Sequence, residues 1–153
     1  MADKLSVKIV RVRGGDNSPP LPRYMTPDAA GMDIYADLGE ELLIQPFGRA
    51  LIPTGFAIAL PQGYEAQVRP RSGLAWRSGL TILNAPGTID ADYRDEVKIL
   101  LVNLSDQPVQ VKPGDRIAQL VVAPVTRVQW EEVSELEATD RQGGFGHTGV
   151  EKG

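Results

Sequence analysis

Residues 82–93 read Ile-Leu-Asn-Ala-Pro-Gly-Thr-Ile-Asp-Ala-Asp-Tyr and bring two carboxylates and a tyrosine together directly after a turn. Asn-Ala-Pro-Gly is typical of a turn, because Pro fixes φ and Gly tolerates positive φ. A hairpin needs no such polar and aromatic cluster for its stability. Asn84, Asp90, Asp92 and Tyr93 therefore indicate a small-molecule pocket. For Asp-Ala-Asp alone, a solvated acidic turn is the alternative.

Three closely spaced arginines, Arg69, Arg71 and Arg77, can hold a phosphate even though the chain has a net charge of −4. That net charge argues against nucleic-acid binding, which needs a basic face. The absence of cysteine excludes disulfides, thiolate metal sites and cysteine nucleophiles. The single His147 excludes sites that need two histidines. The candidate chemistry therefore rests on carboxylates and arginines.

The 153 residues fit one domain with a substantial core. The amino terminus has no apolar signal region, and no apolar run approaches membrane-spanning length. A cytoplasmic protein that binds no membrane is the expectation.

The elements that must position the pocket are short strands, because 16 glycines and 12 prolines punctuate the chain. Apolar alternation predicts strands at Leu5–Val12, Glu41–Ile44, Arg49–Ile52, Gly55–Leu60, Glu65–Val68, Leu80–Leu83, Val97–Val102, Val109–Val111, Ile117–Ala123 and Thr126–Glu132. A short helix is allowed near Gly73–Arg77. Many short strands at close spacing indicate an all-β barrel or jelly roll.

The end of the chain differs in composition from the rest. Glu131–Thr139 is acidic, and Arg141–Gly149 is rich in glycine. Such a segment cannot pack a core and should be mobile when free. We therefore expect a β domain over residues 1–133 and a flexible arm over residues 134–153. The arm is either an ordinary disordered terminus or a lid, in which Phe145 covers a base and Arg141 meets a phosphate.

Five segments occur in a fixed order along about residues 22–149. They are Ala30–Ala36, Pro70–Leu74, Asn84–Arg94, Gly114–Leu120 and Gly143–Gly149. In residue types, order and separation they resemble the five motifs of the trimeric dUTP diphosphatases (dUTPases).

This resemblance implies a jelly-roll-like β-barrel subunit and a homotrimer whose active sites are shared between subunits. It also implies Mg²⁺-dependent hydrolysis of dUTP to dUMP and pyrophosphate, which supplies dUMP for thymidylate synthesis and limits uracil incorporation into DNA. No nucleic acid and no membrane are expected among the partners.

The resemblance also implies residue roles. Asp90 activates the water that attacks the α-phosphorus, and Tyr93 lies under the deoxyribose. The uracil is held by Asn84, Thr88, Ile89 and Lys98, with the backbone around Thr88–Asp90. The phosphates are contacted by Arg71, Ser72, Gly73 and Gln119. The arm contributes Arg141, Phe145, Gly146 and Thr148.

The metal should take its ligands from phosphates and water, with no direct protein ligand. Asp33 either touches the hydration shell of the metal or pairs with an arginine. Asp92 carries a weaker expectation, since a second carboxylate can simply cap the turn. Two departures from the family pattern are a shorter interval from Arg141 to Phe145 and Asp95 where many members have glycine.

Two alternatives are weighed against this interpretation. Deaminases of dCTP share the motif order but resemble this chain less around residues 90–93. They carry a catalytic glutamate near the position of Leu100, and a leucine cannot shuttle a proton. A non-catalytic β binding module would explain the strands but neither the Asp90 cluster nor Phe145 in the arm.

Overall fold

Short antiparallel strands make up nearly all of the regular structure, as the spacing of glycine and proline predicts. The computed structural model describes residues 4–151. Residues 1–3 of the predicted β domain and 152–153 of the predicted arm lie outside the described residues. The elements are β1 (Lys8–Arg11), β2 (Met32–Tyr35), β3 (Leu42–Ile44), β4 (Arg49–Pro53), β5 (Phe56–Ala59), β6 (Tyr64–Arg69), α1 (Ser72–Ser78), β7 (Leu80–Ile82), β8 (Gly87–Ile89), β9 (Lys98–Asn103), β10 (Val109–Val111) and β11 (Arg116–Pro124). The all-β prediction is confirmed.

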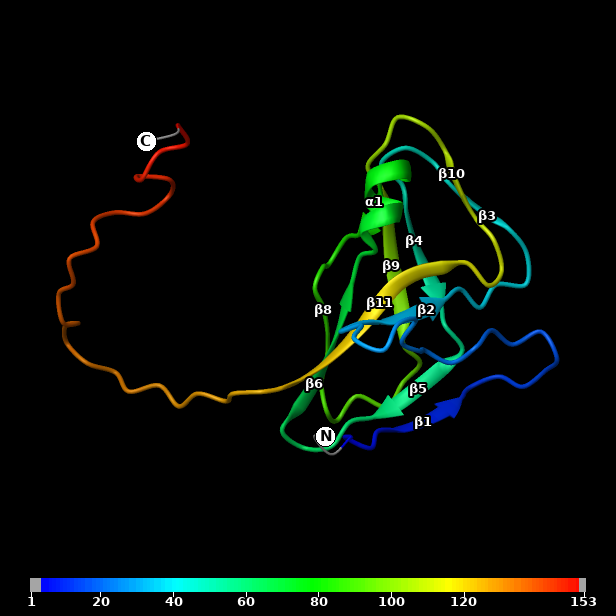
Figure 1. Ribbon diagram of the computed structural model, residues 1–153, viewed down its shortest axis with the longest axis horizontal. Helices are drawn as coiled ribbons and strands as arrows, with labels where there is room; N and C mark the ends of the chain where they lie inside the picture. The colour runs from blue at the N-terminus through cyan, green and yellow to red at the C-terminus, as the bar shows by residue number, and fades with distance from the viewer. Residues whose placement is uncertain (1–3, 152–153) are drawn as a thin grey trace.

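The strands pair into small sheets around one body (Figure 1). The largest has the order β2-β11-β6-β8, and a three-stranded sheet has the order β4-β9-β7. Two further pairs, β1 with β5 and β3 with β10, complete the arrangement. Strands that are distant in sequence thus become neighbours, which is characteristic of a jelly-roll-like barrel.

The predicted hairpin around the turn at Asn84–Gly87 is present in a more elaborate form. β7 pairs with β9, so that Leu80 lies opposite Asn103 and Ile82 opposite Leu101. The connection between them contains the extra strand β8, which pairs with β6 instead, placing Thr88 opposite Gln67. The polar cluster therefore lies where two sheets approach each other.

The core lies between these sheets and consists of aliphatic side chains with one phenylalanine. Its fully buried members include Ile34, Ile52, Phe56, Ile99 and Leu101. Burial of each such side chain contributes roughly 1.5–3 kcal/mol. Burial alternates with a period of two at the start of β9, over residues 98–101, whereas Leu101, Val102 and Asn103 at its end are all buried.

Asn103 is a fully buried polar residue at the end of β9, and its side chain is satisfied by hydrogen bonds. Its Nδ2 donates to the carbonyls of Ile44 at 2.9 Å and Gln107 at 2.7 Å, and its Oδ1 accepts from the amide of Ser105 at 2.9 Å. The side chain thereby fixes the turn between β9 and β10 to the end of β3.

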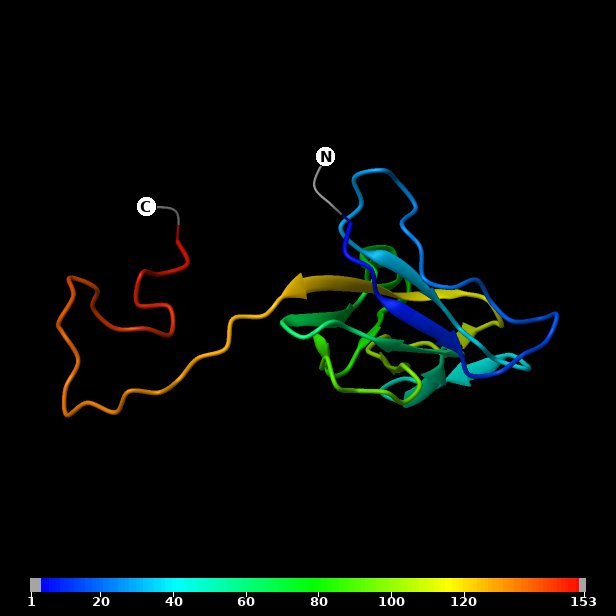
Figure 2. The same cartoon turned by 90° about the horizontal axis from the view of Figure 1, so that it is seen from below.

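The predicted helix near Gly73–Arg77 is confirmed as α1, whereas the strand predicted at Thr126–Glu132 is wrong. Its residues alternate in polarity, but the chain leaves the body at Pro124, and no strand lies beside it. Residues beyond that point run away from the barrel in both views (Figures 1 and 2). Trp130 on this segment and Trp76 on α1 are both 89% exposed.

Within residues 4–151, no helix has the length and apolar character needed to cross a membrane.

Candidate functional site

A cavity of about 200 Å³ opens between β6, β8 and β9. It brings together Asn84, Thr88, Ile89, Tyr93 and Lys98, all of which the sequence assigned to the base and the sugar. The remaining wall is Val68, Gly87, Val97 and Leu100. Apolar side chains with a few polar groups are typical of a small-ligand site.

One wall of this cavity is the edge strand β8. It pairs with β6 on one side, and it ends the order of its sheet among the described residues. β9, across the cavity, is already paired on both sides with β4 and β7. Backbone N–H and C=O groups of β8 that point away from β6 therefore have no strand to bind, and they can serve a planar polar ligand.

The loop after β8 is folded into turns that fix its polar residues. The amide of Tyr93 donates to the carbonyl of Asp90 at 3.1 Å, and Nη1 of Arg94 donates to the carbonyl of Ala91 at 2.6 Å. The Tyr93 hydroxyl donates to the carbonyl of Glu96 at 3.0 Å. Tyr93 is thus held by hydrogen bonds at both its backbone amide and its side-chain hydroxyl.

Asp90 lies at the boundary between two spaces. The preceding Ile89 lines the cavity, whereas Asp90 itself is exposed and lines a neighbouring open depression of about 820 Å³. Tyr64, Arg94 and Arg127 border the same depression. The predicted catalytic carboxylate therefore adjoins the base cavity through Ile89 but is not part of its lining.

A second polar cluster lies where β2 and β11 meet the start of α1. Nη1 of Arg116 lies 3.1 Å from Oδ2 of Asp33, and Nε of Arg71 lies 3.7 Å from Oδ1 of Asp33. Nη1 of Arg71 also donates to the carbonyl of Arg116 at 2.9 Å. Asp33 therefore holds two guanidinium groups. Of the two roles expected from the sequence, the structure shows pairing with arginine.

The other predicted phosphate contacts adjoin this cluster. Ser72 and Gly73 directly follow Arg71 at the beginning of α1. Gln119 lies opposite Asp33 in the pairing of β11 with β2, and its Nε2 donates to the carbonyl of Pro70 at 2.9 Å. Arg71 and Arg116 line a cavity of about 280 Å³ that is separate from the one beside β8.

Sequence reasoning missed Arg116, Arg13 and Glu96. Arg116 follows the turn Lys112–Asp115 and lies in the same motif as Gln119, which the sequence assigned to the phosphates. That position in the motif could have identified Arg116 as a candidate residue. Arg13 and Glu96 form an ion pair across 83 positions of sequence, with 2.7 Å between Nη1 and Oε1. Such a long-range pair has no local signature.

The described residues include no group of three or more histidine, cysteine, aspartate or glutamate side chains suited to a metal ion. Asp33 pairs with the arginines of the second cluster, and each of its oxygens faces an arginine. This donor set fits a hydrated ion carried by phosphates better than a cation held directly by the chain.

The arm residues Arg141, Phe145, Gly146 and Thr148 do not join either cluster within this chain. The side chain of Phe145 is fully exposed, and the segment extends away from the barrel (Figure 2). Local turns give it some shape, with the amide of His147 donating to the carbonyl of Gly144 at 3.2 Å.

Comparison with known proteins gives consistent matches. The family model for dUTPase matches residues 17–149. The deoxyuridine 5'-triphosphate nucleotidohydrolase of Wolbachia sp. subsp. Brugia malayi (strain TRS) is 53% identical over 150 residues, covering 96% of both chains. The enzyme of the same name from Desulfotalea psychrophila (strain LSv54 / DSM 12343) is 63% identical over 131 residues, covering 85% of this chain and 87% of its own.

Solved structures agree on the fold. A mutant dUTPase of Staphylococcus bacteriophage 80alpha with dUpNHpp has a TM-score of 0.81 at 25% identity, covering 95% of this chain and 99% of its own. A mutant dUTPase from phage phi11 of S. aureus, described as revealing the coordination of a structural Mg(II) ion, has a TM-score of 0.75 at 24% identity. That match covers 87% of this chain and 99% of the phage chain.

Proposed function

Because this chain belongs to the dUTPase family, we propose how its own residues carry out the hydrolysis of dUTP to dUMP and pyrophosphate. The observation that carries the residue assignment is the cavity beside β8. It gathers in one place the residues that the sequence assigned to the base and the sugar. Relatives named deoxyuridine 5'-triphosphate nucleotidohydrolase match 96% and 85% of this chain.

Uracil binds in this cavity against the edge of β8. Uracil presents an acceptor at O4 and a donor at N3, and cytosine presents the reverse pattern. Backbone groups cannot exchange donor for acceptor by rotating, whereas an amide side chain can. A site that pairs with uracil therefore leaves its own polar groups unpaired when cytosine enters, and that rejection is strong.

Tyr93 supports the deoxyribose and excludes a 2′-hydroxyl. Its ring lines the cavity next to the turn that carries Asp90. Because its hydroxyl is engaged by the carbonyl of Glu96, the ring has little freedom to move aside for a larger sugar. Discrimination of this kind acts by exclusion rather than by added affinity.

The triphosphate binds to Arg71, Ser72, Gly73 and Gln119. Asp33 holds Arg71 and Arg116 in place, so that guanidinium groups face the anion without rearranging. Arginine suits this role because its planar fork matches phosphate oxygens.

Mg²⁺ accompanies the triphosphate, and when bound it neutralises the phosphate charge and makes pyrophosphate a better leaving group. Because both oxygens of Asp33 pair with Arg71 and Arg116, the metal would take its ligands from phosphate oxygens and water, and Asp33 would act by holding the two arginines.

Asp90 acts as the general base. Its carboxylate positions a water molecule and takes one proton as the water oxygen bonds to the α-phosphorus. The bond from the α-phosphorus to the bridging oxygen breaks, and pyrophosphate leaves with the electron pair. The product is dUMP, and the proton passes from Asp90 to solvent.

The complete site needs more than one copy of this chain. The base cavity and the arginine cluster lie in separate cavities of one subunit, and Phe145 is exposed on a segment that leaves the body. A homotrimer would bring the arginine cluster of one copy, the cavity of another and the arm of a third together. Phe145 then stacks on uracil, while Arg141, Gly146 and Thr148 approach the γ-phosphate.

Pyrophosphate release from each deoxynucleoside triphosphate in the presence of Mg²⁺ tests the activity. Release from dUTP alone is expected. Ammonia release from dCTP would instead favour a deaminase of the same fold, although Leu100 forms part of the cavity wall and cannot transfer a proton. Absence of any turnover would favour a binding module.

A further inference from the structure

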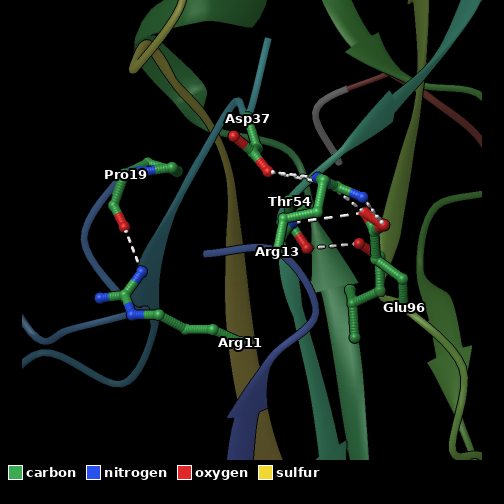
Figure 3. A network of polar contacts seen from close by, with 8 residues as sticks. Arg11, Arg13, Pro19, Asp37, Thr54 and Glu96 are labelled. Carbon is green, nitrogen blue, oxygen red and sulfur yellow. Dashed lines mark hydrogen bonds and ion pairs between the residues drawn. The ribbon is translucent and has the colours of Figure 1, made fainter. Parts of the chain in front are cut away.

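Arg13 forms an ion-pair cluster with Asp37 and Glu96, none of which lines either of the two cavities described above (Figure 3). Its Nη1 and Nη2 donate to the two oxygens of Glu96 at 2.7 and 2.8 Å. Its Nε and Nη2 donate to Oδ2 of Asp37 at 3.0 and 2.8 Å. The guanidinium group therefore uses its whole fork, which is the strongest geometry for such a pair.

Backbone hydrogen bonds fix the surroundings of this cluster. The amide of Asp37 donates to the carbonyl of Pro53, and the amide of Val97 donates to the carbonyl of Phe56, both at 2.9 Å. The Thr54 hydroxyl donates to the carbonyl of Val97. Residue 97, and with it the end of the preceding loop, is thus hydrogen-bonded to the turn between β4 and β5 and to the start of β5.

Gly55 in that turn is required by close approach. It has a φ of +80°, and a Cβ on it would lie 2.6 Å from Oδ2 of Asp37. Its amide also points at Oε2 of Glu96 at 3.4 Å. The turn therefore admits the Asp37 carboxylate at this place because position 55 lacks a side chain.

Glu96 is poorly hydrated, since its side chain is only 11% exposed. The hydrogen bond from Arg13 lowers the pKa of Glu96 against the opposing effect of burial, and the Gly55 amide acts in the same direction as Arg13. A carboxylate withdrawn from water needs such a partner, and loss of one member of the pair leaves an uncompensated charge.

The same residue supports the sugar side of the cavity through its backbone. The carbonyl of Glu96 accepts the hydrogen bond from the Tyr93 hydroxyl at 3.0 Å. The Tyr93 side chain is 41% exposed, so core packing does not hold it. Its position depends on where the Glu96 carbonyl lies, and the Glu96 side chain is anchored to Arg13.

We propose that Glu96 and Arg13 are positioning residues for sugar selection, acting through the Tyr93 hydroxyl. The ion pair ties the end of the 90–97 loop to Arg13, which follows β1, next to the contacts of this loop with the β4–β5 turn. The Glu96 carbonyl then fixes the tyrosine ring across the path of a 2′-hydroxyl. This inference rests on the proposed role of Tyr93 at the deoxyribose.

The test compares kcat/KM for dUTP with kcat/KM for UTP in Glu96→Gln, Arg13→Gln and Tyr93→Phe. Each variant keeps an aromatic ring at position 93 but weakens or removes one of the contacts that fix it. The dUTP-to-UTP ratio should fall by about 3- to 10-fold in each, the size expected for one net hydrogen bond. Tyr93→Phe and Glu96→Gln combined should lower the ratio no further than either alone.

Asp37→Asn is the matched control, because Asp37 binds the same guanidinium group but lies outside the 90–97 loop. It should leave the ratio unchanged even where the melting temperature falls. An equal loss of selectivity in Asp37→Asn, or an unchanged ratio in both Glu96→Gln and Arg13→Gln, would overturn the proposal.

Tyr93→Ala separates this inference from the proposed function. If Tyr93→Ala loses its preference for dUTP over UTP while Glu96→Gln keeps it, the positioning role of Glu96 is rejected but the role of Tyr93 stands. An unchanged ratio in Tyr93→Ala rejects the sugar-excluding role of Tyr93, and the positioning role falls with it.

Discussion

The side-chain amide of Asn84 packs against Gly87 across the turn that leads into β8. A Cβ on Gly87 would lie 3.3 Å from Nδ2 of Asn84 and 3.3 Å from Cβ of Val68. Gly87 and both neighbours line the base cavity, so a side chain at position 87 would displace other residues of its wall.

Gly87→Ala should therefore weaken binding of dUMP without unfolding the protein. The added methyl group must push Asn84 or Val68 aside, and overpacking of this kind costs about 1–3 kcal/mol. Isothermal titration should show at least a several-fold higher Kd. Gly39→Ala is the control, since nothing lies within 4 Å of a Cβ there. Equal affinity in the two variants would contradict this view of the cavity.

Asp90→Asn should retain dUTP binding while turnover falls by about 10²–10⁴-fold, the usual contribution of a general base. The amide accepts a hydrogen bond from water but cannot take its proton. Rapid-quench measurement of dUMP formation provides the rate. Asp92→Asn is the matched control, because Asp92 borders the same depression and should keep most activity. Near-normal turnover in Asp90→Asn would remove this residue from the mechanism.

Acid should selectively remove the contribution of Glu96 to stability. The pKa of Glu96 is lowered in the folded protein, chiefly by the hydrogen bond from Arg13. Its contribution is thus fully present above the unfolded value of about 4.3 and is lost as pH falls through the folded value. Thermal unfolding of wild type and Glu96→Gln should differ most near neutral pH and converge in acid. The exposed Glu40, changed to Gln, should show no such convergence.

Truncation after Asp140 should leave the melting temperature nearly unchanged and abolish most turnover. The removed residues are exposed, and those described lie away from the body, so they contribute little to folding. Ordering them costs on the order of 1 kcal/mol per residue, which only bound nucleotide can offset. Scanning calorimetry and a turnover assay give the two readouts. Phe145→Trp should keep more activity than Phe145→Ala, since a large ring can still stack. A fully active truncated protein would make the arm an ordinary terminus.

Mixing inactive Asp90→Asn and Phe145→Ala subunits should restore part of the activity, because some sites in hybrid trimers combine intact residues from both. Mass spectrometry can confirm that subunits exchange. Exchange without recovered turnover would contradict sites shared between copies.

Most of the fold follows from local pattern, and the exceptions have physical causes. The apolar run at residues 97–102 predicts β9 well, because most of that strand is buried. β8 escaped prediction since it is three residues long and begins with glycine directly after a turn. Thr126–Glu132 has a strand-like pattern, but a strand forms only beside a partner, and none is present along it.

The site was predictable where chemistry is local and unpredictable where it depends on distant partners. Asn84, Thr88 and Tyr93 come from one stretch of sequence, and the structure gathers them in one cavity. The pairing of Asp33 with Arg116 and of Arg13 with Glu96 arises only when β2, β11 and the loops are assembled. No spacing rule reveals such pairs.

The surface positions of Trp76 and Trp130 determine what the intrinsic fluorescence of this protein can report. The chain has two tryptophans, and both indole rings are mostly in water before anything unfolds. Denaturation should therefore shift the emission maximum very little. Any contact that covers Trp130 should move its emission to shorter wavelength. Emission measured across a dilution series would then follow association between copies, while circular dichroism would be needed to follow the loss of the β structure itself.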